Sequence, residues 1–222
     1  AKLPAGIGTN FGDEKVRKAF KNYAVRIAKD YKPEYVGLGS EINTYMNKHP
    51  EDADNLASLI GETIPLIKSE SPSTKITATF QYEGLIGKIE NAQWALFEKV
   101  EPKLDLVSIT TYPSPWFASP NDIPENYYNE LKEQTTKPVI IAESGWPTGG
   151  ESKFSGSEKN QKDFVERFPE LIKDIDAKLW IWWFPHDWNG EGYPEFFKTM
   201  GLNTTTGQPK PSWAAWQKIR QE

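Results

Sequence analysis

Short apolar runs alternate along the chain with longer segments in which apolar residues recur every three or four positions. The apolar runs predict β-strands, because each is short and is bounded by glycine, proline or polar residues. The predicted strands are residues 35–40, 75–80, 104–110, 138–143 and 178–184.

The segments between these strands predict amphipathic helices. The first helix follows Asp13, a residue type that favours the N-cap position. The second has its apolar face between residues 56 and 67, with a kink expected at Pro65. A third helix is predicted to begin near Ser157, and a closing helix follows Pro211.

This alternation predicts an α/β fold in which helices cover parallel strands, as in a (β/α) TIM-type barrel. A complete barrel has about eight β/α units, whereas about five can be recognised here. We therefore expect residues 1–222 to form a single, incomplete barrel domain without its N-terminal strands. A doubly wound open sheet is the alternative, but no glycine-rich phosphate loop follows a strand. The glycine-rich segment at residues 6–12 has no strand before it and is predicted to be a loop.

An incomplete barrel has two open edges whose backbone groups need partners. The inward side chains of Val139 and Ile141 would also face water. These features predict a homodimer or a larger homo-oligomer in which neighbouring chains cover the edges. The alternative is a monomer in which residues 1–12 cover the gap.

Composition excludes several classes of partner. The net charge of the 222-residue chain is −5 and its charges are mixed in sign, so nucleic acid is not an expected partner. No apolar run approaches the roughly 18 residues of a membrane span, and no signal peptide is visible. The absence of cysteines excludes disulfides and thiolate metal sites, and with only two histidines a histidine-based metal site is not expected. The nine Trp, nine Tyr and eleven Phe residues fit either core packing or stacking on sugar rings.

Two carboxylates end predicted strands that lie three β/α units apart. Glu41 follows the first strand and Glu143 ends the fourth. Because the C-terminal ends of barrel strands meet at one face, the two acids are expected to lie across the mouth from each other. Paired acids of this kind hydrolyse glycosides: one protonates the leaving oxygen, and the other attacks or activates water. The alternative for each residue is a solvated acid in a turn.

Four motifs resemble known glycoside hydrolases of clan A. "IIAESGWPTGG" resembles the nucleophile signature of the family 17 β-1,3-glucanases, and "YVGLGSEIN" resembles the acid/base strand of that family and of the family 53 β-1,4-galactanases. "ITTYPSPWF" resembles their Tyr-Pro strand, and "WWFPHDW" resembles the last strand of the galactanases. The resemblance covers roughly residues 35 to 190. It implies a (β/α)8 barrel with a retaining mechanism, with Glu41 as general acid/base, Glu143 as nucleophile and Tyr112 hydrogen-bonded to the nucleophile.

These observations predict a retaining endo-β-glycosidase that cleaves a β-linked glucan or galactan, and such a substrate implies an extracellular enzyme. Ser40 stands where the families have an asparagine, which weakens the expected contact with the sugar. The rival interpretation is therefore a weakly active or inactive carbohydrate-binding barrel fragment that self-association completes. The expected substrate-binding residues are Ser40, Asn43, Tyr82, Tyr112, Trp146, Trp183 and His186, although the tyrosines and tryptophans could equally be core residues.

Overall fold

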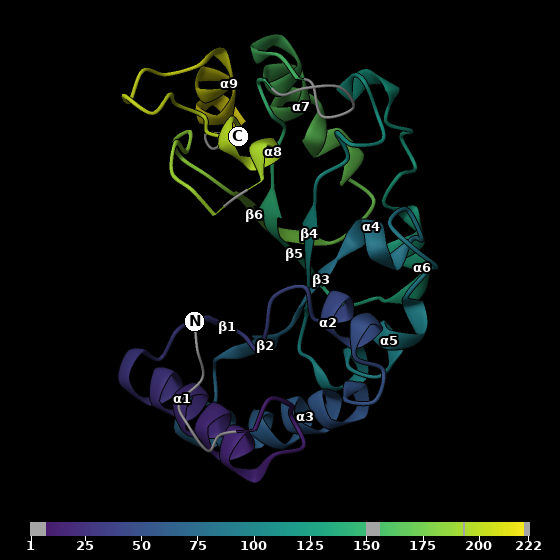
Figure 1. Ribbon diagram of the computed structural model, residues 1–222, viewed down its shortest axis with the longest axis vertical. Helices are drawn as coiled ribbons and strands as arrows, with labels where there is room; N and C mark the ends of the chain where they lie inside the picture. The colour runs from purple at the N-terminus through teal and green to yellow at the C-terminus, as the bar shows by residue number, and fades with distance from the viewer. Residues whose placement is uncertain (1–7, 150–155, 193, 220–222) are drawn as a thin grey trace. The chain divides into compact units, whose positions relative to one another are not determined.

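The computed structural model describes residues 8–149, 156–192 and 194–219 (Figure 1). The chain forms two compact units, of which the first ends at Ile109 and the second begins at Thr110. The boundary falls within strand β4 (Val107–Thr111). That residues 1–222 act as one domain stays a prediction.

The first unit contains two long helices that lie side by side, α1 (Glu14–Tyr31) and α3 (Ala53–Glu70) (Figure 1). The Asp13 carboxylate accepts hydrogen bonds from the backbone N–H groups of Lys15 and Val16, which confirms the predicted N-cap. Helix α3 continues through Pro65. The remaining elements of this unit are β1 (Tyr35–Gly37), α2 (Ile42–Lys48), β2 (Lys75–Thr77), β3 (Thr79–Gln81), α4 (Tyr82–Leu85), α5 (Trp94–Glu98), η1 (Glu101–Lys103) and the start of β4.

The predicted strand at residues 75–80 is divided in two. Strand β2 pairs in parallel with β1, with Val36 opposite Ile76. Strand β3 belongs to a second sheet, whose strand order is β3-β4-β5-β6. The break falls at Ala78 because the residues on either side of it pair with different strands.

The second unit contains the end of β4, then β5 (Val139–Ser144) and β6 (Ala177–Trp182), which pair in parallel. Helices α7 (Glu158–Leu171) and α9 (Pro211–Ile219) lie side by side (Figure 1). As predicted, one helix begins next to Ser157 and another begins at Pro211; the Ser157 side chain caps α7. The shorter helices of this unit are η2 (Pro120–Asp122), α6 (Asn129–Gln134) and α8 (Glu195–Lys198).

Side chains on one face of β6 pack against the two long helices of the second unit. The Trp180 ring lies 4.5 Å from the rings of Phe168 in α7 and Trp216 in α9, measured between centroids. The alternate residues Leu179 and Ile181 point to the other face and are 41% and 42% exposed. β6 therefore presents an apolar face to solvent, and it is the last strand in the order of its sheet.

The expectation that Val139 and Ile141 face water is wrong. Their exposed fractions are 2% and 0%, because β5 lies inside its sheet whereas β6 lies at the edge. In the described ranges, none of the helices is both long enough and apolar enough to cross a lipid bilayer.

Candidate functional site

Glu143 and Tyr112 meet in the second unit at the C-terminal ends of neighbouring strands. Glu143 is the penultimate residue of β5, and Tyr112 directly follows β4. The Tyr112 hydroxyl donates a hydrogen bond to Glu143 Oε2 at 2.9 Å. This contact confirms the expected pairing of the two side chains. It orients the carboxylate, since one oxygen is held by the phenol.

The turn after Glu143 packs closely against Met200 and Tyr112 at Gly145. A Cβ atom on Gly145 would lie 2.8 Å from Met200 Sδ and 3.4 Å from Tyr112 Cε1. A larger residue at this position would require the Met200 side chain to shift, whereas Tyr112 lies at ordinary contact distance. The Ser-Gly-Trp-Pro turn thus contributes to the packing around the candidate nucleophile.

Helix α8 supplies two aromatic rings that the motif analysis missed. Phe197 and Phe196 meet the Tyr112 ring edge-on, at centroid distances of 5.3 and 6.2 Å. Both phenylalanines are partly exposed. Their only signal in the sequence is an adjacent aromatic pair in the long segment after the last strand, and this pair follows no strand end.

Trp183 directly follows β6 and lies beside the end of β5. Its backbone N–H donates to the Ser144 carbonyl at 3.0 Å. Its indole Nε1 is buried and has no hydrogen-bond partner among the described residues. His186 lies further along the same loop and is exposed, with its backbone bridged to Asn203.

Trp146 has no exposed face on which a sugar could stack. Its side chain is fully buried, with its ring centroid 5.3 Å from that of Phe164. Of the two alternatives for this residue, its position favours the core. Gly150, the last residue of the nucleophile motif, lies outside the described residues.

Glu41 lies in the first unit, between β1 and α2. Burial alternates from Val36 to Gly39, with Val36 and Leu38 buried and Gly37 and Gly39 exposed, and the alternation ends at Ser40, which is also exposed. Glu41 itself has left-handed backbone angles, φ 49° and ψ 43°. Among the described non-glycine residues only Lys32, the C-cap of α1, shares a positive φ. Such a conformation costs about 1–2 kcal/mol outside glycine.

Asn43 and Tyr82 lie in the interior of the first unit, and both are fully buried. Asn43 Nδ2 donates to the carbonyl of Gln81 and to Gln93 Oε1, and its Oδ1 accepts from the Gln81 N–H. These contacts indicate a structural role for Asn43, because its amide already binds protein groups on both sides. Helical geometry after Glu41 turns Asn43 inward, and a motif alone does not reveal this.

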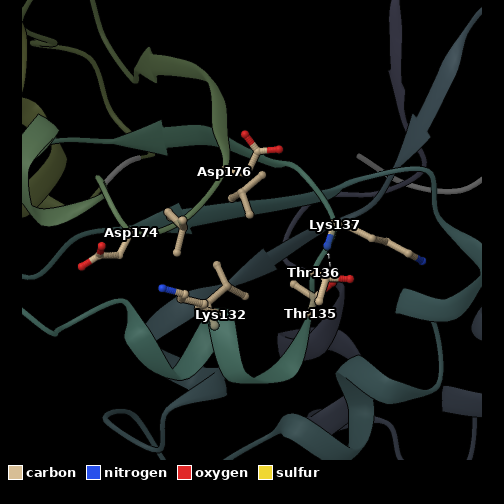
Figure 2. Close-up of a pocket in the computed structure, with 9 residues that line it drawn as sticks. Lys132, Thr135, Thr136, Lys137, Asp174 and Asp176 are labelled. Carbon is tan, nitrogen blue, oxygen red and sulfur yellow. Dashed lines mark hydrogen bonds between the residues drawn. The ribbon is translucent and has the colours of Figure 1, made fainter.

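A separate hollow of about 330 Å³ lies at the other end of the strands of the second unit (Figure 2). Val139, the first residue of β5, lines it together with the segment that precedes β6. Figure 2 shows Lys132, Lys137, Asp174 and Asp176 around it. This hollow therefore lies at the N-terminal ends of β5 and β6, whereas Glu143 is near the C-terminal end of β5. Within the described parts of the chain, no three metal-ligating side chains cluster.

No protein-family model matches the sequence, and neither does any curated protein. Solved structures do match. A β-glucuronidase from an uncultured Clostridium sp. gives a TM-score of 0.68 at 19% identity, over 99% of this chain and 39% of that one. Dictyoglomus thermophilum β-D-glucuronidase gives a TM-score of 0.67 at 16% identity, over 100% of this chain and 39% of that one. Ruminococcus gnavus β-glucuronidase gives a TM-score of 0.65 at 16% identity, over 94% of this chain and 36% of that one.

The chain therefore spans well under half the length of these enzymes. The matches do not bear on families 17 and 53, which the motifs resemble. At such low identity the likeness concerns the fold. It confirms an α/β fold with parallel strands, consistent with part of a (β/α) barrel.

Proposed function

We propose that the chain carries the catalytic residues of a retaining glycoside hydrolase, with Glu143 as nucleophile and Glu41 as general acid/base. The hydrogen bond from Tyr112 to Glu143 carries this proposal. A carboxylate that is oriented by a phenol, at a strand end and beside a closely packed turn, suits nucleophilic attack.

In the first proposed step, a carboxylate oxygen of Glu143 attacks the anomeric carbon of the sugar. The glycosidic C–O bond breaks, and Glu41 gives its proton to the departing oxygen. The products are an alcohol and a glycosyl ester of Glu143. In the second step, Glu41 takes a proton from water, whose oxygen attacks the anomeric carbon and releases Glu143. Two inversions leave the β configuration unchanged.

The backbone of Glu41 supports its assignment. Strained non-glycine residues persist where the surrounding structure holds them, and they are frequent at active sites. Lys32, the other described non-glycine residue with a positive φ, has an ordinary role as a helix C-cap. Glu41 is the N-cap residue of α2, but its side chain makes no capping hydrogen bond, so a catalytic role would account for its strain.

For the substrate we propose a β-linked polysaccharide, either a glucan or a galactan. The side chains near Glu143 in the second unit suit contact with the apolar face of a sugar ring, since Tyr112, Phe196 and Phe197 are aromatic. A polymeric substrate would place the enzyme outside the cell. The proposed chemistry needs no cofactor.

The test is release of reducing ends from β-glucans, β-galactans and β-mannans, with an aryl β-glucuronide added because the solved neighbours are β-glucuronidases. We expect turnover on a glucan or a galactan. Turnover of the glucuronide alone would show that the proposed substrate class is wrong, whereas the proposed mechanism would still apply. Absence of turnover on every substrate would contradict the proposal.

A weakly active or inactive carbohydrate-binding fragment is the second candidate. Ser40 supports it, because it stands where the related motif has an asparagine. This candidate predicts calorimetric binding of the oligosaccharides without release of reducing ends, so one set of ligands separates the two.

A further inference from the structure

Lys210 has a buried ammonium group outside the proposed catalytic chemistry. The residue directly precedes α9, and its side chain is 3% exposed. Its Nζ donates to Asp187 Oδ1 at 2.6 Å, to Thr148 Oγ1 at 3.0 Å and to the Thr199 carbonyl at 3.2 Å. An ammonium group has three N–H donors, so these contacts use all of them.

The three acceptors belong to segments that surround the candidate nucleophile within the second unit. Thr148 lies in the turn that follows Glu143 at the end of β5. Asp187 lies in the loop that follows Trp183 at the end of β6. Thr199 directly follows α8, the helix that carries the two phenylalanines beside Tyr112. One cation therefore joins all three segments.

The joined segments also bind one another. The Thr148 N–H donates to the Thr199 carbonyl at 3.0 Å, and the Gly149 N–H donates to Thr199 Oγ1 at 3.1 Å. Asp187 Oδ1 accepts from the Gly201 N–H at 2.9 Å. Met200, between Thr199 and Gly201, packs against Gly145. A shift at Lys210 would thus be transmitted to the turn beside Glu143.

The charge at this position is costly. Burial lowers the pKa of Lys210, although Asp187 and, from α7, Glu158 oppose the shift. Apolar residues of similar volume often serve stability as well as a buried ion pair, or better. The pair is better explained by the single geometry that it imposes on the three segments.

We propose that Lys210 is a positioning residue for the hydrolase reaction. It holds the loops after β5 and β6 so that Glu143, Tyr112 and the α8 phenylalanines keep their reactive arrangement. This inference rests on the proposed function. Lys210 touches no reacting atom and acts through Thr148, Thr199 and Asp187.

The test compares Lys210→Met and Lys210→Arg with the wild type. Each kcat is expressed per active site. The active sites are counted by covalent labelling with a 2-fluoro-glycoside of the sugar that the wild type hydrolyses. All measurements are made well below the melting temperature. We expect Lys210→Met to lose about 10²-fold in kcat with little change in KM, as misplacement of a catalytic group does. Lys210→Arg should recover much of that loss. The control is Lys162→Met, which removes a surface ion pair of α7. An unchanged kcat per active site in Lys210→Met would overturn the inference, because a purely structural lysine changes only the folded fraction.

Thr148→Val provides a second route if Lys210→Met does not fold. It removes the hydroxyl that accepts from Lys210 and donates to the Thr199 carbonyl at 3.1 Å, and it leaves Lys210 paired with Asp187. It should lower kcat in the same direction. Hydrogen exchange at the amides of Gly149 and Gly201 provides a readout that needs no substrate. Faster exchange in the variant supports the positioning of the loops by Lys210, whether or not the wild type has activity. A wild type that hydrolyses none of the substrates would overturn the proposed function, and the exchange result would still stand. Unchanged exchange in the variant would overturn the inference.

Discussion

Glu143 is the residue on which the proposed chemistry depends most directly. Glu143→Gln keeps the size of the side chain but cannot form the glycosyl ester, so kcat should fall on the order of 10⁴-fold. The fold and oligosaccharide binding should be retained. The measurements are turnover, circular dichroism and calorimetric binding, with Glu166→Gln on the surface of α7 as the matched control. Turnover close to that of the wild type would end the nucleophile assignment.

Tyr112 should contribute through its hydroxyl alone. Tyr112→Phe keeps the ring contacts with α8 and removes the hydrogen bond to Glu143. A hydrogen bond to a charged group contributes about 1.5–3 kcal/mol, so kcat should fall roughly 10- to 100-fold. Steady-state kinetics test this, with the melting temperature of the variant compared with that of the wild type to show that the fold is kept. A variant with unchanged kcat would make the hydroxyl incidental.

The strain at Glu41 predicts a conflict between stability and activity. Glu41→Gly should relieve the left-handed backbone and so raise the free energy of unfolding by roughly 1 kcal/mol, while abolishing turnover. Glu41→Gln should abolish turnover without that gain. Urea titration of both variants provides the comparison. A Glu41→Gly protein that is less stable than Glu41→Gln would show that other contacts of Glu41 outweigh the strain.

At the residue scale, the resemblance of the motifs to known glycoside hydrolases implied the contact between Tyr112 and Glu143, and the structure shows that hydrogen bond. The sequence did not reveal the depth of Trp146 or Asn43. The burial of each residue depends on a contact that is remote in sequence: Trp146 packs against Phe164 of α7, and Asn43 donates to Gln93. The role of Lys210 was not predicted for the same reason, since an isolated lysine before a helix has the sequence pattern of a surface residue.

At the element scale, Asp52 joins the loop before α1 to α2 and α3. Its carboxylate accepts from the Phe11 N–H at 2.8 Å, from the Tyr45 hydroxyl at 2.7 Å and from Asn55 Nδ2 at 2.8 Å. Burial opposes ionisation of Asp52, but these donors hold its pKa below the usual value. Burial and the hydrogen bond to Asp52 raise the pKa of Tyr45 to about 12.

This pair gives a pH-dependent prediction. The folded pKa of Tyr45 lies above the unfolded value of roughly 10, so the stability from the neutral phenol is complete below that pH. It is lost as the pH rises through about 12. The stability difference between wild type and Tyr45→Phe should therefore shrink over this window. Urea titrations and the ultraviolet absorbance of tyrosinate measure it, and a Tyr45 that ionises near pH 10 would contradict the hydrogen bond.

The helix starts at Asp13 and Ser157 were readable because capping is a local property of three or four residues. The division of residues 75–80 was not readable. Thr77 and Thr79 have similar β-propensity, and only the identity of their partner strands separates β2 from β3.

At the scale of the whole molecule, we predict self-association through β6. A hollow of about 390 Å³ lies along this strand, lined by Leu179 and Ile181 and by Trp213 and Trp216 of α9. Burying such side chains contributes roughly 25 cal/mol per Å² of apolar surface, against which the cost of association must be set. We expect a homodimer at micromolar concentration, and Ile181→Lys should dissociate it.

Sedimentation equilibrium tests this prediction, with Lys162→Met as the control that leaves β6 intact. A single species with the mass of one chain, stable on dilution, would refute self-association. The alternation of strands and helices was sufficient to predict the fold class. What covers β6 was not predictable, because an apolar strand has the same pattern whether its partner belongs to its own chain or to another.

The uneven placement of tryptophan gives the chain an internal optical probe. Eight of its nine tryptophans follow Thr110, and Trp94 is the one that precedes it. Selectively excited fluorescence therefore follows the second unit almost alone. Far-ultraviolet circular dichroism also follows the 18-residue helices α1 and α3 of the first unit. Denaturation curves that coincide by both signals would mean that the units unfold as one cooperative block, and curves that separate would mean that each unit unfolds independently.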